Sequence, residues 1–431
     1  MPEDVPNFEE TEDALLEGDR PYRRGSARAA LAHRDFALVW SGSLASNIGT
    51  WMQNAALGAL AFKLTGSSGF VALLGFAQLG PLLALSLVGG LLADSVDRRW
   101  LLVACQVEQM VLSFVLAAFA AQDHPSHAAL FVCVLGIGVG NALFAPTMSA
   151  VMPQLVGMED LAGAVSLQSV QLNLSRVIGP VIGGLIIPIV HVWGVFALNG
   201  FTYLFAIATL LLVTIPRPYP DRDEQGWRRA LGGFRVARSD GLIGRCLILI
   251  TAFSFFCLPF IGLLPVIAGD NLGMNVTGRA YGALFACFGS GAALGAVAVG
   301  TVLVPYSKAM VVHVGLPLFA AALFVLALLR APAPAFPVVF CVGLFYFATI
   351  TSLSTVLQSH LNQQLRGRVM ALWIMGFGGT VPFGLLAGGW LADMTSVTNV
   401  LMVGVVFALL LTVTIDLRER PPAGRAKMQA T

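Results

Sequence analysis

The chain has 431 residues, of which 57% are hydrophobic and only 11% are charged. A soluble domain carries about a quarter charged residues, so the composition excludes an ordinary soluble globular protein and predicts an integral membrane protein. The net charge of +2 excludes little, because the position of each charge along the chain is more informative than their sum.

The first 36 residues are polar and begin with several acidic side chains. A cleaved secretory signal would show a basic start followed by an apolar run, so we expect a disordered cytoplasmic tail at 1–36. Twelve continuous apolar segments follow, each near the ~20 residues that a helix needs to cross a bilayer, and their continuity excludes a barrel of alternating strands. The predicted helices are 37–62, 70–93, 100–121, 128–151, 162–190, 194–215, 246–268, 280–303, 310–329, 336–358, 369–392 and 397–415.

Only one connection between the predicted helices is long and charged. It divides the chain into an N-terminal six-helix bundle at 37–215 and a C-terminal six-helix bundle at 246–416, with a cytoplasmic linker at 216–245 and a tail at 417–431. Within the linker, "GWRRALGGFRVARSDG" predicts an amphipathic surface helix. With the N-terminus in the cytoplasm, 21 of the 25 Lys and Arg residues fall on the cytoplasmic side, so we expect a multi-pass protein of the cell membrane with both termini inside.

A charged loop signature ends the second predicted helix. It reads "GGLLADSVDRR" and includes Asp94, Arg98 and Arg99. With the six-plus-six arrangement and the stretches "LASNIGTWMQNAAL" and "LRGRVMAL", it resembles the major facilitator superfamily, in the branch of enterobactin exporters, macrolide efflux proteins and transmembrane secretion effectors. The resemblance implies an all-α fold of twelve transmembrane helices in two bundles. It also implies that the three residues act as a latch that joins the halves in the outward-facing state.

The fifth predicted helix carries a second motif, "GPVIGG". It is similar to the antiporter-type motif of the same superfamily through Gly179, Pro180, Gly183 and Gly184. Closely spaced glycines let helix backbones approach each other in lipid, and "GSGAALGAVAVG" at 289–300 shares this property. We expect these two stretches to form a sliding seam between the halves, with static packing as the alternative.

Polar and aromatic side chains on several predicted helices suggest the lining of a central cavity. Asn47, Trp51 and Asn54 recur at i, i+4 and i+7, which places them on one helical face. Asn side chains in hydrocarbon need partners and usually face the bundle interior. The other candidates are Asn141, Phe144, Thr251, Phe255, Tyr346 and Thr349. Such a lining favours a bulky amphiphile over a sugar or a phosphate ester, and ordinary hydrogen bonding between helices is the alternative role of each polar residue.

Two charges lie well inside predicted helices. Arg176 shares a helical stripe with Asn173 and Pro180, which points toward the bundle interior. Glu108 lies nine residues past Arg99, about 13 Å along its helix at 1.5 Å per residue. One interpretation is structural: Glu108 and Arg176 form a pair, or neighbouring carbonyls and Asn173 satisfy Arg176. The other is that Glu108 is a protonatable carboxylate, coupled to the opening of the cavity and biased by Arg176.

The sequence therefore predicts a secondary exporter that moves a siderophore, a macrolide-like drug or another amphiphile by alternating access and proton antiport. An uptake permease and a non-transporting sensor or scaffold are the alternatives. No hydrolase, metalloprotease or P-loop motif is present, and the six cysteines lack metal-ligand spacing, so we expect neither an enzyme nor a cofactor nor a metal site. The expected partners are an amphiphilic small molecule, protons and the lipid bilayer, without nucleic acid, and we expect a monomer.

Overall fold

The computed structural model describes residues 22–215, 238, 240–361, 369–370 and 372–417, and at 86–91, 93 and 94 it describes the backbone alone. The predicted amphipathic helix of the linker and most of both predicted tails lie outside these residues.

All regular structure among the described residues is helical. The N-terminal part contains α2 (Ala27–Ala32), α3 (Arg34–Thr65), α4 (Ser68–Ser95), α5 (Arg98–Ala120) and α6 (His127–Leu212). The C-terminal part contains α8 (Gly241–Cys257), α9 (Pro259–Gly262), α10 (Leu264–Val266), α11 (Arg279–Gly300), α12 (Lys308–Leu328), α13 (Pro332–His360), α15 (Val381–Met394) and α16 (Val397–Thr414), with π-helical turns η1 (Ile267–Asn271) and η2 (Met375–Gly379).

Helix α6 is one continuous element of 86 residues, but two residues inside it leave the helical conformation. Gly157 has φ 75° and His191 has φ 58°, so α6 turns back on itself twice and contains three segments. These segments correspond to the predicted fourth, fifth and sixth helices. Nine helices of the described part are long and apolar enough to cross a membrane, with α6 counted once and α3 not included. The total of twelve crossings stays a prediction, because it requires α3 and each segment of α6 to cross.

Short polar side chains define where many of these helices begin. Ser67, Ser126, Ser307 and Ser396 each precede a helix and accept a hydrogen bond from the backbone N–H three residues later. The first N–H groups of a helix have no partner within it, so a serine at this position satisfies one of them and fixes the end of the helix. The four serines thus mark the ends of long apolar segments that hydropathy alone places only approximately.

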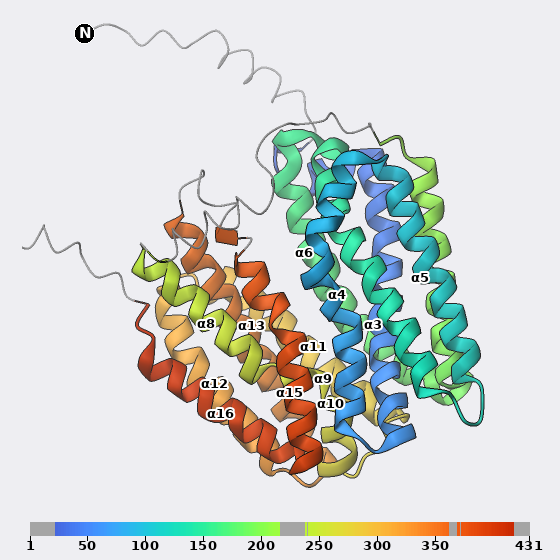
Figure 1. The fold of residues 1–431 in the computed structure, drawn as a ribbon. Helices are drawn as coiled ribbons and strands as arrows, with labels where there is room; N and C mark the ends of the chain where they lie inside the picture. The colour runs from blue at the N-terminus through green and yellow to red at the C-terminus, as the bar shows by residue number, and fades with distance from the viewer. Residues whose placement is uncertain (1–21, 216–237, 239, 362–368, 371, 418–431) are drawn as a thin grey trace, which may run out of the picture.

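The helices form two groups that lie side by side, α2–α6 in one and α8–α16 in the other (Figure 1). We call them the N-terminal group and the C-terminal group. Helix α3 runs from Arg34 at one end of the molecule to the turn at Gly66 at the other, and we name the two ends the Arg34 end and the Gly66 end. The two groups approach each other toward the Gly66 end, at the bottom of Figure 1.

Glycine residues lie in two of the helix pairs that connect the groups. Helix α4 packs against α15, where a Cβ added to Gly389 would overlap the side chain of Ala72. The second pair is α6 and α11, where a Cβ added to Gly184 would overlap the backbone of Gly282. Because lipid provides no hydrophobic drive between helices, such close backbone contact is what holds these surfaces together.

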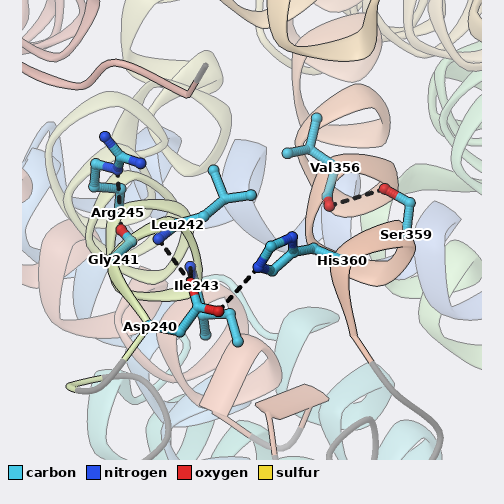
Figure 2. Close-up of polar contacts among 8 residues, drawn as sticks. All are labelled: Asp240, Gly241, Leu242, Ile243, Arg245, Val356, Ser359 and His360. Atoms are coloured by element: carbon cyan, nitrogen blue, oxygen red, sulfur yellow. Dashed lines mark hydrogen bonds and ion pairs between the residues drawn. The ribbon is translucent and has the colours of Figure 1, made fainter. Parts of the chain in front are cut away.

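At the Arg34 end, α8 is tied to α13 through Asp240. Its carboxylate accepts hydrogen bonds from the N–H groups of Leu242 (2.9 Å) and Ile243 (3.2 Å) at the start of α8. It also lies 2.9 Å from Nε2 of His360 at the end of α13, and Figure 2 shows this contact. Partial burial raises the pKa of the Asp240 carboxyl, but the hydrogen bonds from His360, Ile243 and Leu242 outweigh it and the net shift is downward. Asp240 therefore caps one helix and anchors another.

Residues 22–36, which the sequence places in a disordered tail, contain helix α2 and the start of α3. The side chain of Ser26 caps α2. The buried carboxylate of Asp160 accepts a hydrogen bond from the Gly25 N–H at 2.8 Å and lies 3.0 Å from Nε2 of His33. Composition cannot predict this docking, because Asp160 lies more than 120 residues away in the sequence.

Candidate functional site

A cavity of about 340 Å³ lies between the two groups and takes lining residues from both. Its wall is mainly apolar and aromatic, with two carboxamides and one arginine. The aromatic and polar residues of the lining are Trp51, Asn54, Gln78, Arg176, Tyr281, Phe285, Phe288, Tyr346, Phe347 and Phe377. Small-molecule sites in proteins share this character, a concave apolar surface with a few polar groups that fix orientation.

The guanidinium of Arg176 contacts two aromatic rings in this cavity. Its Cζ is 5.2 Å from the ring centroid of Trp51 on α3 and 5.4 Å from that of Phe347 on α13. A desolvated cation–π contact is worth about 2 kcal/mol, so the two rings together can offset the roughly 2.5–3.5 kcal/mol that an arginine costs in a membrane interior. The rings leave the N–H groups unsatisfied, and the buried Nε atom has no hydrogen-bond partner among the described residues. Arg176 also connects the groups, because Phe347 belongs to the C-terminal group.

Asn54 on α3 and Tyr346 on α13, two of the polar residues predicted on these helices, line the same cavity. Asn54 accepts a 2.6 Å hydrogen bond from Gln78 on α4, so the two carboxamides satisfy each other in part. The ring of Tyr346 stacks on Phe253 and Phe288, with interplanar angles of 8° and 18°. Trp51, Asn54, Arg176 and Tyr346 therefore line one cavity, and their role in binding stays a prediction.

Several lining residues were not predicted from the sequence. Tyr281, Phe285 and Phe288 follow one another at i, i+4 and i+7 on α11 and form an aromatic face of the cavity. This spacing is the one that drew attention to Asn47, Trp51 and Asn54 on α3, so periodicity could have found them.

A second hollow, of about 760 Å³, contains two further predicted residues, Thr251 and Phe255 on α8. It lies between α8 and residues 372–380, which include η2, and Arg238 and Thr380 also line it. The rest of its wall is apolar. The structure thus separates the predicted pathway residues of α8 from those of the central cavity.

Four predicted pathway residues line neither hollow. Asn47 and Asn141 are half-buried. Phe144 is half-buried too and packs against the apolar core of the N-terminal group. Thr349 is completely buried and faces Gly315 on α12, inside the C-terminal group. Helical spacing places Thr349 near Tyr346, but it does not reveal that the helix turns this side chain away from the cavity.

Glu108 lies inside the N-terminal group and not in the cavity. Its carboxylate packs against Gly136 and Gly140 in the first segment of α6, where a Cβ on Gly140 would overlap it. The buried Oε2 atom has no hydrogen-bond partner among the described residues. The structure forms no ion pair between Glu108 and Arg176, which corrects the paired alternative, and Asn173 donates instead to the Ser169 carbonyl. The geometric reason is that Arg176 is directed toward the seam between the groups.

The loop signature joins helices within the N-terminal group. Arg99 donates from Nε to the Leu210 carbonyl at 3.1 Å and from Nη2 to the Leu211 carbonyl, both at the end of α6. Nη1 of Arg98 lies 3.5 Å from the Ala150 carbonyl. Cations are favourable at these carbonyl-rich helix ends. That these residues join the halves in the outward-facing state stays a prediction. The side chain of Asp94 lies outside the described residues.

The glycine motif on α6 faces two different neighbours. Gly179 and Gly183 contact Trp51 and Met52 on α3, within the N-terminal group, and a Cβ on Gly179 would lie 2.7 Å from the Trp51 Cβ. Gly184 contacts Gly282 on α11 and is the member that reaches the C-terminal group, while the carbonyl of Pro180 also borders Gly282.

On α11, one glycine of the predicted stretch at 289–300 continues the seam and another does not. Gly289 lies against the backbone of Arg176 and Val177. Gly295, which the sequence places in the seam, instead packs against Leu344 on α13. Helix α6 thus meets α11 as predicted, but through Gly184, Gly282 and Gly289.

At the Gly66 end, Asp393 closes the boundary between the groups. From the end of α15, its carboxylate accepts hydrogen bonds from Ser67 Oγ (2.6 Å), Ser68 N (2.6 Å) and Gly69 N (2.9 Å). These groups form the N-terminus of α4, where backbone N–H groups and the helix dipole favour an anion. Asp270, in η1, lies close by, and burial and the charge of Asp393 raise the pKa of its carboxyl.

Comparison with known proteins gives three results. Residues 25–431 match the family model of transmembrane secretion effectors. The staphyloferrin A transporter of Staphylococcus aureus is 23% identical over 376 residues, which cover 84% of this chain and 90% of that protein. An uncharacterized MFS-type transporter of Bacillus subtilis is 27% identical over 173 residues, or 40% of each chain.

Solved structures with the same fold are also transporters. The nucleoside transporter NupG superposes with a TM-score of 0.69 at 12% identity, over 89% of this chain and 98% of its own. A bacterial homolog of the human lysosomal transporter Spinster, in an inward-facing and unoccupied conformation, superposes with a TM-score of 0.66 at 15% identity. The match covers 90% of this chain and 99% of that protein. The predicted fold, a helical membrane protein of the major facilitator type, is thereby confirmed.

Proposed function

We propose that this chain, which belongs to the transmembrane secretion effector family, exports an amphiphilic small molecule across the cell membrane by alternating access. The observation that carries the proposal is the cavity lined by both groups, with the Asp393 contact closing the boundary at the Gly66 end. A cavity shared by two groups of helices changes its access when one group rocks against the other.

The distribution of Lys and Arg favours a cytoplasmic location for the Arg34 end. In the described conformation, the contacts between the groups run from Asp393 at the Gly66 end to Gly289 in the middle of α11. A substrate would then enter the cavity from the cytoplasm and leave after the Gly66 end opens. Export is also supported by the antiporter-type motif on α6, and the relative in Staphylococcus aureus is named as a transporter of the siderophore staphyloferrin A.

The driving force we propose is proton antiport, with Glu108 as the protonatable group. Its carboxylate is packed between α5 and α6, and its buried oxygen lacks a hydrogen-bond partner among the described residues. Burial without a partner disfavours the charged form, so a proton bound here would favour one packing of α5 on α6 over another. The Glu108→Gln variant fixes the neutral form and should abolish proton-driven efflux while the protein still folds. Proton-driven efflux retained by this variant would eliminate Glu108 as the coupling group.

The function is tested by the accumulation of a panel of amphiphiles in cells with and without the chain. Export predicts lower accumulation of at least one compound, and an uncoupler should restore it. An uptake permease would raise accumulation in the same assay. Equal accumulation across a broad panel would contradict transport and favour a sensor or scaffold.

A further inference from the structure

The central cavity holds a permanent charge that nothing in its wall neutralises. Arg176 is the only charged side chain among the described residues that line the cavity, so no carboxylate faces it there. Its guanidinium makes no ion pair within the described part of the chain. The contacts with the rings of Trp51 and Phe347 attract the positive charge but provide no hydrogen-bond acceptor for its N–H donors.

A second buried polar atom of the lining that has no partner can also donate a hydrogen bond. The buried hydroxyl of Tyr281 has no partner among the described residues. In contrast, Asn54 and Gln78 are bonded to each other. The wall therefore offers N–H and O–H donors with one positive charge. A buried polar atom without a partner requires an explanation, and a ligand with anionic oxygens would satisfy these donors.

We propose that the cavity selects a ligand with a single carboxylate on an aromatic or apolar body, and that Arg176 binds this carboxylate. The inference rests on the proposed function in taking the cavity as the substrate site, and it narrows the substrate from an amphiphile to an amphiphilic monoanion. Arginine suits the task because its planar donor array can bind both carboxylate oxygens at once. The rings of Trp51 and Phe347 hold the guanidinium in place before the ligand arrives, which reduces the entropy lost on binding.

The test uses two fluorescent probes of nearly equal shape, dansylglycine and its uncharged amide, dansylglycinamide. Each is titrated against the purified full chain in lipid nanodiscs, and the dansyl emission reports entry into an apolar site. A hydrogen bond to a charged group is worth enough to predict that the acid binds about ten- to a hundredfold tighter than the amide. Arg176→Gln should remove this preference by lowering the affinity for the acid while leaving the affinity for the amide unchanged. Arg245→Gln is the matched control, because Arg245 does not line the cavity and bonds to the Gly241 carbonyl of its own helix.

A second variant tests the charge without removing Arg176. Asn54→Asp keeps the oxygen that accepts from Gln78 and places a carboxylate in the cavity wall, one helical turn from Trp51. It should abolish the preference for the acid in a protein that retains its arginine. If Arg176→Gln does not fold, this variant still decides the question.

Three results would overturn the proposal. They are equal binding of acid and amide to the unmodified chain, binding of neither probe, and an undiminished preference in Asn54→Asp. Chloride and acetate are added as competitors, and displacement of dansylglycine by millimolar chloride would show a site for any small anion instead. Failure of the proposed function would look different. The chain would still bind the acid through Arg176, but it would change the accumulation of no compound in cells, so the binding site would exist without transport.

Discussion

Removal of the Asp393 carboxylate should open the Gly66 end of the molecule. In the described conformation, Asp393 accepts hydrogen bonds from Ser67, Ser68 and Gly69 at the start of α4. Loss of a side chain that caps a helix N-terminus costs about 0.5–2 kcal/mol. Because Asp393 is exposed, water replaces part of the lost hydrogen bonding. We therefore expect a free-energy change of about 1.4 kcal/mol, which shifts the equilibrium between the closed and open conformations tenfold. Asp393→Ala should therefore raise the population open at the Gly66 end about tenfold.

The shift can be measured by distances between spin labels at the Gly66 end, at Ala128 in the N-terminal group and Ala331 in the C-terminal group. Both residues are exposed, and the labels are placed in a background without the six native cysteines. Asp393→Ala should add a population at longer distance. Asp123→Ala, which removes an exposed carboxylate at the same end, is the control and should leave the distribution unchanged. Identical distributions for Asp393→Ala and the parent would refute the role of this contact.

Three further predictions concern other contacts. Asp270→Asn should raise the unfolding free energy at neutral pH, because burial and the charge of Asp393 raise the pKa of Asp270, so that its ionised form destabilises the folded chain and stability rises as the pH falls; an unchanged thermal-shift midpoint would contradict this. Gly282→Ala should slow transport because its Cβ would overlap the α6 backbone, whereas Gly300→Ala, with open space around its Cβ, should not; equal rates would argue against the seam. Asp240→Ala should lower the unfolding free energy by about 1 kcal/mol, and since the pKa of Asp240 is lowered, the stabilisation should be present at neutral pH and lost as the pH falls below about 4; a thermal-shift series over pH checks both.

The helices and their order could be predicted from the sequence because the signal is local. A continuous apolar run predicts a crossing helix wherever it occurs. The three segments of α6 were predicted as separate helices, although the turns at Gly157 and His191 interrupt it at single residues. Helix α2 could not be predicted in this way, because its position depends on Asp160, whose partners His33 and Gly25 are distant in sequence.

The site was predicted only in part, because contacts between helices distant in sequence leave no local signal. The stripe on α6 correctly directs Arg176 toward the interior, but its contact with Phe347 crosses between groups and has no local signal. Thr349 shows the limit of periodicity: the rotation of α13 is set by packing against Gly315, so a polar residue one turn from Tyr346 faces a neighbouring helix. The stretch with Gly295 was predicted to meet α6, but Gly295 packs against α13. Closely spaced glycines indicate that a helix packs closely against another helix, but they do not indicate which one.

The central claim is that the two groups must separate at the Gly66 end for substrate to leave the cavity. A cysteine pair replacing Ser67 and Asp393, whose side chains lie 2.6 Å apart, tests it when joined by oxidation in the background without native cysteines. Efflux of the compound identified in the accumulation assay should stop after oxidation and return after reduction. Efflux that continues at its full rate with the two positions covalently joined would contradict the account.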